Sequence, residues 1–443
     1  MHINATTYLV LILLTLSLGA TFDASSTPKE GDEYTTVYCM LPGKPRKLGK
    51  KVIMTGRHLK KTSAVECEAR GGEYEIEDAA AYAYAIQEWE PNSKENNPEK
   101  QTDFGEIYER GGDYKKAAEW YQKASEQDYS KAQILLGNLY EKGLGVDKDF
   151  NKALYWYRRA SGLNDAIKID NGISKQPNTR DDDVAQLPAL PADLKSKNYG
   201  RYYALIIGNQ DYSNWPVLDT PSNDAYKTEE ILKSKYGFNT KVLINATRSE
   251  IFKALEAYKS ELNDQDNLLV YYAGHGDFEE KLDHTYWVPV DGEIGSKAYW
   301  ISTFDITSQV DTIPAKHVLI ISDSCYSGGL TISAIARRLP GMSEKSVRDW
   351  VDGISKKSSR TVLTSGGKTP VLDGGGSGHS VFAKAFLNVL QANDGIIEGV
   401  VLYSQIKDKV RKSAEEYNFE QIPNYAPLKF ANHEGGEFLF VPK

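Results

Sequence analysis

The second half of the chain alternates between short apolar runs and longer mixed stretches, and this alternation restricts the fold more than any other feature of the sequence. The apolar runs predict strands at Tyr203–Ile207, around Leu243–Ile244, and at Asn267–Tyr272, His317–Ser322, Thr361–Thr364 and, as a closing strand, within Glu434–Phe440. The mixed stretches predict helices around Asp224–Tyr236, Ser249–Leu262 and Val381–Leu390, the last amphipathic. This pattern is typical of an α/β domain with a mostly parallel sheet, in which ligands bind outside the carboxyl ends of the strands.

Two of these strands run into polar residues that carry chemistry. The third ends at His275, which lies between Gly274 and Gly276, and the fourth ends in Asp323-Ser-Cys325. An imidazole and a thiol at one sheet edge can act as base and nucleophile, because the imidazole stabilises the thiolate. The amides of Gly276 and Cys325 could then face a developing oxyanion. The alternative is a core cysteine and a strand-end histidine that never meet.

The two strand ends together resemble a known catalytic core. Tyr-Ala-Gly-His-Gly-Asp at 272–277, paired with Asp-Ser-Cys-Tyr-Ser-Gly at 323–328, resembles the caspase–metacaspase superfamily of cysteine peptidases. The likeness runs from about Tyr202 to Gly328 and more loosely to Val441. It implies a caspase-like domain that hydrolyses peptide bonds through a thioester, with Cys325 as nucleophile and His275 as general base and acid. It implies no cofactor and no metal in the bond-breaking step, and calcium activation stays open because no spacing demands a calcium site.

The same resemblance bears on specificity. Asp323 lies two residues before the nucleophile, where metacaspases place an acidic residue of the P1 pocket, and Asn-Asp224-Ala matches a second metacaspase motif whose Asp faces that pocket. Two carboxylates in a partly desolvated cleft suit a guanidinium or ammonium group, so cleavage after Arg or Lys is expected. The alternatives are that Asp224 is the N-cap of the helix it opens and that Asp323 only bonds within its own loop.

Two other histidines compete with His275 for the role of base. His317 opens the fourth strand and therefore lies at the opposite sheet edge from Cys325. His379 follows a glycine-rich loop; it could line the cleft, but we expect an exposed loop position.

The middle of the chain contains an internal repeat. The segment Tyr114–Ala124 recurs as Phe150–Ala160, and each copy follows a Gly-x-x-Tyr motif, at Gly105–Tyr108 and Gly137–Tyr140. Small and aromatic residues at three- and four-residue spacing predict antiparallel helix pairs, with the small residues allowing close approach. The match resembles Sel1-type repeats, relatives of the tetratricopeptide class. A helix at Asp78–Trp89 is expected to cap them. They can dock a protein partner or act as a packed spacer.

The N-terminal region points to export. Tyr8–Ala20 is apolar and uncharged but shorter than the roughly 20 residues of a membrane span, and Ser17-Leu-Gly19 offers a signal-peptidase site. We expect a cleaved signal peptide and a periplasmic or secreted protein; an uncleaved membrane anchor and a buried helix are the alternatives. In an oxidising compartment Cys39 and Cys67 form a natural disulfide pair, which leaves Cys325 as the odd thiol.

These observations divide the chain into five parts. They are a signal peptide (1–20), a small disulfide-stapled β element (30–75), Sel1-like repeats (76–168), a linker rich in Pro, Asp and Ser (169–198) and the caspase-like domain (199–443). The formal net charge of −8 argues against a general nucleic-acid binder, and no stable membrane span is expected. The leading hypothesis is an endopeptidase acting on a peptide or protein substrate. The alternative is a scaffold or adaptor whose caspase-like domain is a recognition module of low activity.

Overall fold

The structure is a computed structural model. It describes residues 36–41, 45–48, 51–54, 58–63, 96–160, 187, 189–279, 284–324, 342–367, 371, 373–374, 378–428 and 431–443. The expected signal peptide, the capping helix at 78–89, Cys67, the side chain of Cys39 and Cys325 lie outside these residues. Among the described residues, no helix has both the length and the apolar character needed to cross a bilayer.

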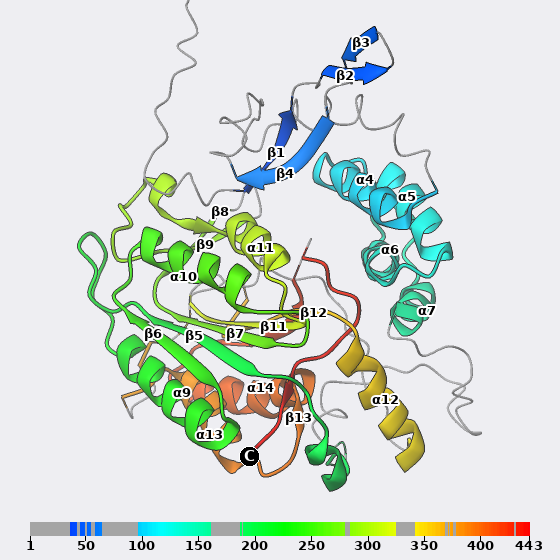
Figure 1. Ribbon diagram of the computed structural model, residues 1–443. Coiled ribbons are helices and arrows are strands. Elements are labelled where there is room, and N and C mark those ends of the chain that lie inside the picture. The colour runs from blue at the N-terminus through cyan, green and yellow to red at the C-terminus, as the bar shows by residue number, and fades with distance from the viewer. Residues whose placement is uncertain are drawn as a thin grey trace, which may run out of the picture.

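A six-stranded sheet forms the centre of the α/β domain (Figure 1). Its strands are, in spatial order, β14 (Asn424–Pro427), β12 (Ser359–Thr364), β11 (His317–Asp323), β7 (Asn267–Ala273), β5 (Tyr202–Gly208) and β6 (Asn239–Ile244). All neighbours are parallel except β14, which is antiparallel to β12. Every residue of β7 and β11 is buried, and this full burial explains why both read as continuous apolar runs.

Helices cover both faces of the sheet (Figure 1). One face packs on α9 (Pro221–Tyr236), α13 (Val381–Ala392) and α14 (Gly399–Glu415). The other packs on α10 (Arg248–Glu261) and α11 (Thr303–Thr312). Alternate residues of β5 divide between the two cores, with Ile206 in the first and Leu205 and Ile207 in the second, as the period of a strand requires. Helix α13 is exposed at Lys384 and Asn388 and at its last two residues, Gln391 and Ala392, and its other residues are buried.

Smaller elements surround the sheet. Strands β8 (Gly276–Glu279), β9 (His284–Trp287) and β10 (Ile301–Ser302) form a second sheet directly after β7, and η4 (Lys297–Tyr299) precedes β10. The expected closing strand within Glu434–Phe440 is present but short. Only Leu439–Phe440 (β15) is extended, and it pairs with β13 (Ile397–Glu398) rather than with the central sheet. The edge position belongs to β14, whose short mixed sequence gave no apolar run.

Between residues 96 and 160, the part of the repeat region that the structure describes, the chain forms four helices: α4 (Pro98–Arg110), α5 (Tyr114–Glu126), α6 (Ser130–Lys142) and α7 (Phe150–Ala160). The repeated glycines lie under the repeated tyrosines. A Cβ on Gly105 would lie 2.5 Å from the Tyr121 ring, and one on Gly137 would lie 2.7 Å from the Tyr157 ring. The missing side chain therefore makes room for the aromatic ring, as the sequence pattern predicted.

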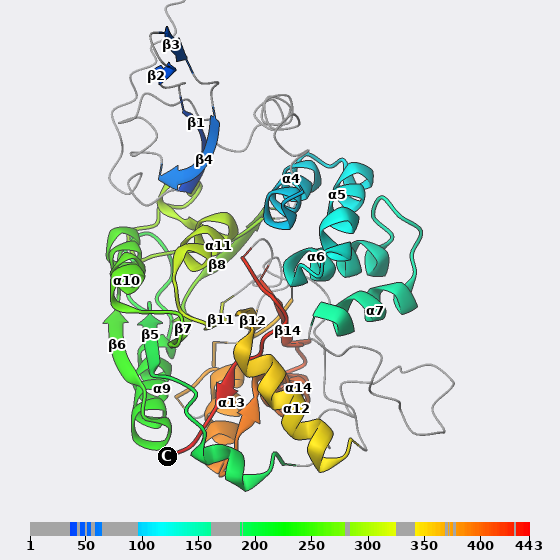
Figure 2. The same ribbon diagram turned by 45° about the vertical axis from the view of Figure 1, so that its right-hand side comes forward.

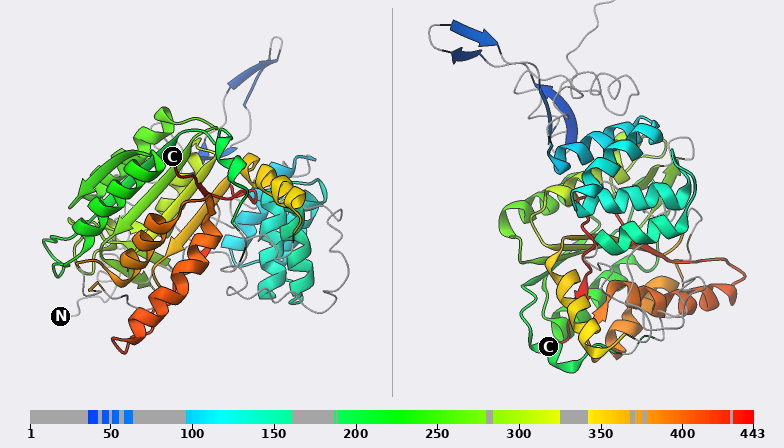
Figure 3. Two further views of the ribbon diagram at one scale, coloured as in Figure 1. Left: turned by 90° about the horizontal axis from the view of Figure 1, so that it is seen from below. Right: turned by 90° about the vertical axis from the view of Figure 1, so that its right-hand side faces the viewer.

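The repeats pack against the α/β domain beside α12 (Glu344–Lys356), as Figures 2 and 3 show. Lys357, directly after α12, contacts the Ser130 hydroxyl at 3.2 Å and also the Ala160 carbonyl. The Arg110 guanidinium lies 5.0 Å from the ring centroid of Phe304 in α11. Two helices of the α/β domain therefore face the repeats.

The last part of the expected linker is packed rather than extended through solvent. Leu190 and Leu194, the latter in η3 (Ala192–Ser196), are buried against Trp350 and other apolar residues of α12. Asp193 forms an ion pair with Arg348 of the same helix. This segment and α12 therefore share a hydrophobic cluster that is separate from the two cores of the central sheet.

The N-terminal β element is described by its backbone. Strand β1 (Thr36–Leu41) pairs antiparallel with β4 (His58–Ser63), and β2 (Pro45–Leu48) pairs antiparallel with β3 (Lys51–Met54). The expectation of a small β element in this region agrees with these two ladders. Its disulfide staple stays a prediction.

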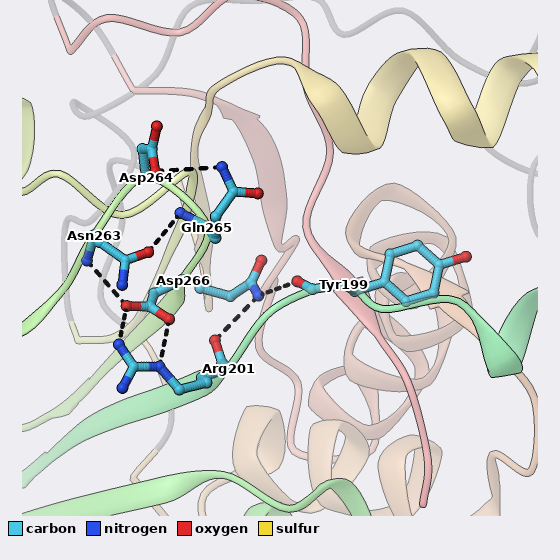
Figure 4. A network of polar contacts seen from close by, with 7 residues as sticks. Tyr199, Arg201, Asn263, Asp264, Gln265 and Asp266 are labelled. Carbon is cyan, nitrogen blue, oxygen red and sulfur yellow. Dashed lines mark hydrogen bonds and ion pairs between the residues drawn. The ribbon is translucent and has the colours of Figure 1, made fainter.

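At the amino end of the sheet, a polar network joins the starts of β5 and β7 (Figure 4). Arg201 donates two hydrogen bonds to the Asp266 carboxylate, at 2.8 and 2.7 Å. The side-chain amide of Asn267 donates to the Tyr199 carbonyl at 2.8 Å, and Asp266 also accepts from the Asn263 amide at 2.9 Å. The network fixes two neighbouring strands in register before they cross the core.

Candidate active site

His275 lies two residues past the end of β7, at the carboxyl edge of the sheet. Its Nε2 donates to the Pro216 carbonyl at 2.8 Å, and its backbone amide donates to the Tyr212 hydroxyl at 2.8 Å. Its ring contacts those of Tyr212 and Trp215, with centroids 4.7 and 5.2 Å away. Burial lowers the pKa of His275 below its usual value, because a charged ring would lose hydration there. The imidazole is therefore held in one orientation and kept neutral.

Gly274 is required by the close approach of two tyrosines. A Cβ at this position would lie 2.6 Å from the Tyr212 hydroxyl and 2.9 Å from the Tyr272 hydroxyl. Tyr272 donates to the His275 carbonyl at 2.8 Å, and Tyr212 accepts from the His275 amide. The glycine before the histidine thus serves to position the histidine backbone.

The end of β11 lies beside the end of β7. Asp323 is in register with Ala273, and the Gly274 amide donates to the Asp323 carbonyl at 3.3 Å. Cys325, the predicted nucleophile, lies outside the described residues. The described chain reaches Ser324, one residue before it, whose hydroxyl lies 3.0 Å from that of Ser322.

Gly276, the predicted oxyanion residue, is the first residue of β8 and is buried. The Val288 amide donates to the His275 carbonyl, so residues 275 and 288 form a hydrogen-bonded pair of the β8–β9 ladder. Hydrogen-bonded and non-hydrogen-bonded pairs alternate in an antiparallel ladder, so the amide of Gly276, which pairs with Trp287, points away from β9. In the described sheet β8 is an edge strand, which leaves that amide outside the ladder.

The two predicted pocket carboxylates are joined by one dipeptide. His379 Nδ1 lies 2.6 Å from Asp224 Oδ1, and the Ser380 amide donates to Asp224 Oδ2 at 3.2 Å. The Ser380 hydroxyl donates to Asp323 Oδ2 at 2.5 Å. Burial raises the pKa of Asp224 to about 7 and that of Asp323 to about 7, and the negative charge of Asp224 adds to the second rise. The structure thus brings both acids to one polar cluster.

Both alternatives for these acids are wrong. Asp224 is not an N-cap, because α9 begins at Pro221 with Thr220 in the cap position, and Asp224 lies one turn inside. Asp323 does not bond only within its loop, because its partner Ser380 is 57 positions away in sequence. The expectation that His379 is an exposed loop residue is also wrong, since Asp224 holds its half-buried ring.

A third acid borders the cluster. Asp373 accepts from the Asp219 amide at 2.7 Å and from the Thr220 hydroxyl at 2.6 Å, which ties its loop to the start of α9. Its charge contributes to the raised pKa of both Asp224 and Asp323. Sequence reasoning missed Asp373, and also Ser380 and Tyr212. Only Ser380 had a local signal, a serine before an apolar helical run, which is typical of an N-cap.

His317 lies where the sequence placed it, at the amino end of the sheet. It is the first residue of β11, and its Nδ1 lies 2.7 Å from the Asn267 side-chain oxygen. Burial lowers the pKa of His317 to about 3, so the ring is neutral at physiological pH. It lies six strand positions from Asp323 and takes no part in the cluster. Within the described residues, no three His, Cys, Asp or Glu side chains are grouped to hold a metal ion.

Comparison with known proteins identifies both regions. The family model for the caspase domain, Peptidase C14, matches residues 201–431, more than half of the chain, and the Sel1 repeat model matches residues 103–129 and 130–165. The fold and the paired strand ends define an α/β domain of the caspase type. The chain belongs to the caspase-domain family and carries Sel1 repeats ahead of that domain.

Individual relatives match over shorter stretches. Metacaspase-6 of Arabidopsis thaliana is 30% identical over 191 residues, 38% of this chain and 50% of the relative. Mucosa-associated lymphoid tissue lymphoma translocation protein 1 of Homo sapiens is 34% identical over 88 residues, 20% of this chain and 10% of the relative. The crystal structure of caspase-1 from Spodoptera frugiperda is 16% identical and covers 54% of this chain and 92% of its own, with a TM-score of 0.34. The chain spans half or less of the length of these two sequence relatives.

Proposed function

We propose that this protein is a cysteine endopeptidase in which Cys325 is the nucleophile and His275 the general base and acid. The register of β7 and β11 carries the proposal. Ala273 and Asp323 are paired, His275 follows the first by two residues, and Cys325 follows the second by two residues. Two segments that leave one sheet edge side by side can bring an imidazole to a thiol.

The hydrogen bond of His275 assigns the roles of its two ring nitrogens. Nε2 donates to Pro216, so the neutral ring holds its proton there and Nδ1 accepts the thiol proton. The thiolate bonds to the scissile carbonyl carbon, and the imidazolium returns the proton to the leaving amine as the C–N bond breaks. Water then attacks the thioester with His275 as base, releasing the acid and restoring the thiol. The Gly276 amide is the candidate donor to the oxyanion.

The P1 residue is Arg or Lys in this proposal. Asp224 and Asp323 are buried carboxyl groups with raised pKa values, and a cation placed between them would offset both their desolvation and their repulsion. An acidic P1 side chain would add a third negative charge to the same cluster. The charge of the cluster thus favours a basic substrate residue.

The helical repeats serve as a docking module for a protein partner, and the N-terminal apolar run directs export to the periplasm or outside the cell. The Sel1 match supports the first statement, because stacked helix pairs present extended binding surfaces. The uncharged apolar stretch at Tyr8–Ala20 supports the second. N-terminal sequencing of the mature protein tests export, since a start after residue 19 or 20 is expected.

Fluorogenic peptides that differ only at P1 test the catalytic proposal. Wild-type protein is expected to cleave after Arg or Lys, and Cys325→Ala and His275→Ala are each expected to lower kcat by about 10³-fold or more, with unchanged melting temperature. Ser343→Ala, which removes an N-cap serine of α12, is the matched control and should keep the wild-type rate. An absence of turnover by wild type, with and without calcium, would contradict the proposal and favour the scaffold role.

A further inference from the structure

We propose that His379 and Ser380 form a clamp that orients the two P1 carboxylates and thereby sets the preference for a cationic P1 side chain. The inference rests on the proposed function, because it concerns the pocket of the same site. It assigns a role to two residues at the start of α13, which neither the motif at 272–277 nor that at 323–328 includes.

One serine contacts both acids. Its amide donates to Asp224 and its hydroxyl donates to Asp323, although these acids come from α9 and β11. The same hydroxyl oxygen accepts from the Ala383 amide at 2.8 Å, so Ser380 is also the N-cap of α13. A hydroxyl has one proton to give and two lone pairs to accept with. The proton goes to Asp323, and the helix amide fixes the rotamer that sends it there.

His379 holds the other oxygen of Asp224. With Oδ2 bonded to the Ser380 amide and Oδ1 to the His379 ring, both oxygens of Asp224 have a partner and the carboxylate plane is fixed. Burial lowers the pKa of the His379 ring, and the positive charges of Lys227 of α9 and Lys384 of α13 lower it further. Both lysines favour the neutral imidazole, so the ring orients the carboxylate without cancelling its charge.

The clamp stands on a rigid base. Phe382 and Phe386 of α13 are fully buried, and Phe386 stacks on Tyr271 of β7 with centroids 6.2 Å apart. Tyr271 belongs to the strand that leads to His275. A shift of α13 would therefore disturb the packing beneath the candidate catalytic histidine, so the pocket and the histidine share one support.

The hydrogen bonds also favour the charged form of the two acids. Bonds from Ser380 lower the pKa of Asp224 and of Asp323 against the larger rise that burial causes. Without these donors both carboxyls would be protonated more at neutral pH, and a neutral carboxyl attracts a guanidinium less. The loss should therefore appear in the affinity for the cation and not in the chemical step.

Binding to a Cys325→Ala background tests the clamp without requiring turnover. Two peptides are compared by calorimetry, one with P1 Arg and one with P1 citrulline, which has nearly the same shape and no charge. Ser380→Ala is expected to raise the Kd of the Arg peptide about tenfold and that of the citrulline peptide less than twofold. Ser380→Thr, which keeps the hydroxyl, should restore most of the affinity. Ser343→Ala loses an N-cap serine elsewhere and should leave both Kd values unchanged.

A second pair of variants covers the case in which Ser380→Ala does not fold. His379→Leu removes the ring nitrogen, and His379→Asn keeps a side-chain amide near the position of Nδ1. Leu should weaken Arg binding about fivefold more than Asn does. The same variants should also be made in the active protein, which keeps Cys325. Their weaker binding of the Arg peptide should appear there as a higher KM and not as a lower kcat.

Two failures are distinguishable. If the Arg peptide does not bind the Cys325→Ala protein and wild type does not cleave after Arg or Lys, both the pocket and the clamp are wrong. If wild type prefers Arg but Ser380→Ala and Ser380→Thr bind alike, and His379→Leu binds like His379→Asn, the proposed function stands and the clamp is overturned.

Discussion

The two ends of the central sheet both bury titratable side chains, but they hold them differently. At the carboxyl end, Asp224 accepts hydrogen bonds from the His379 ring and the Ser380 backbone amide, and Asp323 accepts one from the Ser380 hydroxyl. At the amino end, the buried Arg360 donates to the carbonyls of Lys316, Ser359 and Ile313. Backbone carbonyls cannot be exchanged for a ligand without unfolding the strand ends, whereas carboxylates retain lone pairs for an incoming cation. This difference supports the proposal that the carboxyl end binds a cationic side chain, whereas the contacts at the amino end stabilise the fold.

The histidines follow the same division. At the amino end, His433 Nδ1 accepts from the Arg360 amide at 3.0 Å, and burial lowers the pKa of His433 to about 3 and that of His317 to about 3. At the carboxyl end, His275 is only half-buried, and burial lowers its pKa. A ring that must gain and lose a proton during catalysis cannot be as fully desolvated as one that only fills the core.

The largest effect is expected for Asp323→Asn, which tests whether the carboxyl end of the sheet binds the substrate. This change should lower kcat/KM for P1 Arg peptides about 100-fold, or about 3 kcal/mol, because it removes a charged partner of the guanidinium. It should also raise the free energy of unfolding by about 1–3 kcal/mol at pH 8, since the buried carboxylate has a pKa raised to about 7. Peptide kinetics and urea unfolding measure the two effects. A variant that loses both activity and stability would show that Asp323 is structural.

Arg360→Met tests the amino end. The change removes the hydrogen bonds that the Arg360 side chain donates to three carbonyls, and we expect a loss of about 3 kcal/mol in the free energy of unfolding. Activity per folded molecule should stay within twofold of wild type, because the site lies at the other end of the strands. Active-site titration alongside chemical denaturation checks this. A fall in kcat of the folded protein would show that the amino end of the sheet also affects activity, and would contradict the separation of the two ends.

The pH dependence of stability should separate the two ends. Between about pH 3 and 6.5 the unfolded state binds more protons at His317 and His433, so stability falls as the pH is lowered through this window, by up to ~1.4 kcal/mol per pH unit and histidine. Asp224 and Asp323 act in the opposite sense, because the folded state binds their protons between about pH 4 and 7, and their contribution falls as the pH rises.

The Asp323→Asn variant isolates the histidine contribution. With one opposing acid removed, its stability should fall more steeply than that of wild type between pH 6.5 and 4.5. Urea midpoints at several pH values measure the slope. Identical profiles for the two proteins would mean that the pKa of Asp323 does not differ between the folded and the unfolded state.

The smallest effect is expected for Arg201→Ala in the network of Figure 4. Asp266 is buried but the Arg201 side chain is 55% exposed, so water competes for the pair. We expect a small loss in the free energy of unfolding, below that of Arg360→Met and reduced by salt, and no change in peptide cleavage. Thermal unfolding at low and high salt measures it. A loss as large as that of Arg360→Met would show that ion pairs, and not burial, stabilise the amino end.

The parts of the fold that the sequence predicted are those whose burial is uniform. Strands β7 and β11 are buried at every residue, so they read as unbroken apolar runs. The repeated small residues predicted a close approach of the helices, which is observed between Gly105 and the Tyr121 ring. Strand β14 and the small sheet of β8 to β10 gave no such signal because their sequences mix polar and apolar residues. The pairing of the tail strand β15 with β13 could not be predicted, since two residues carry no information about their partner.

Local patterns of burial in the sequence were enough to predict the buried strands β5, β7, β11 and β12, the helices α9, α10 and α13, the helical repeats, and the sheet edge at which His275 and Asp323 lie. The partners within the pocket were decided only by the tertiary structure. His379 and Asp224 are 155 positions apart, and Ser380 and Asp323 are 57 apart. A hydrogen bond between distant segments depends on where the helices pack, and no local propensity encodes that position.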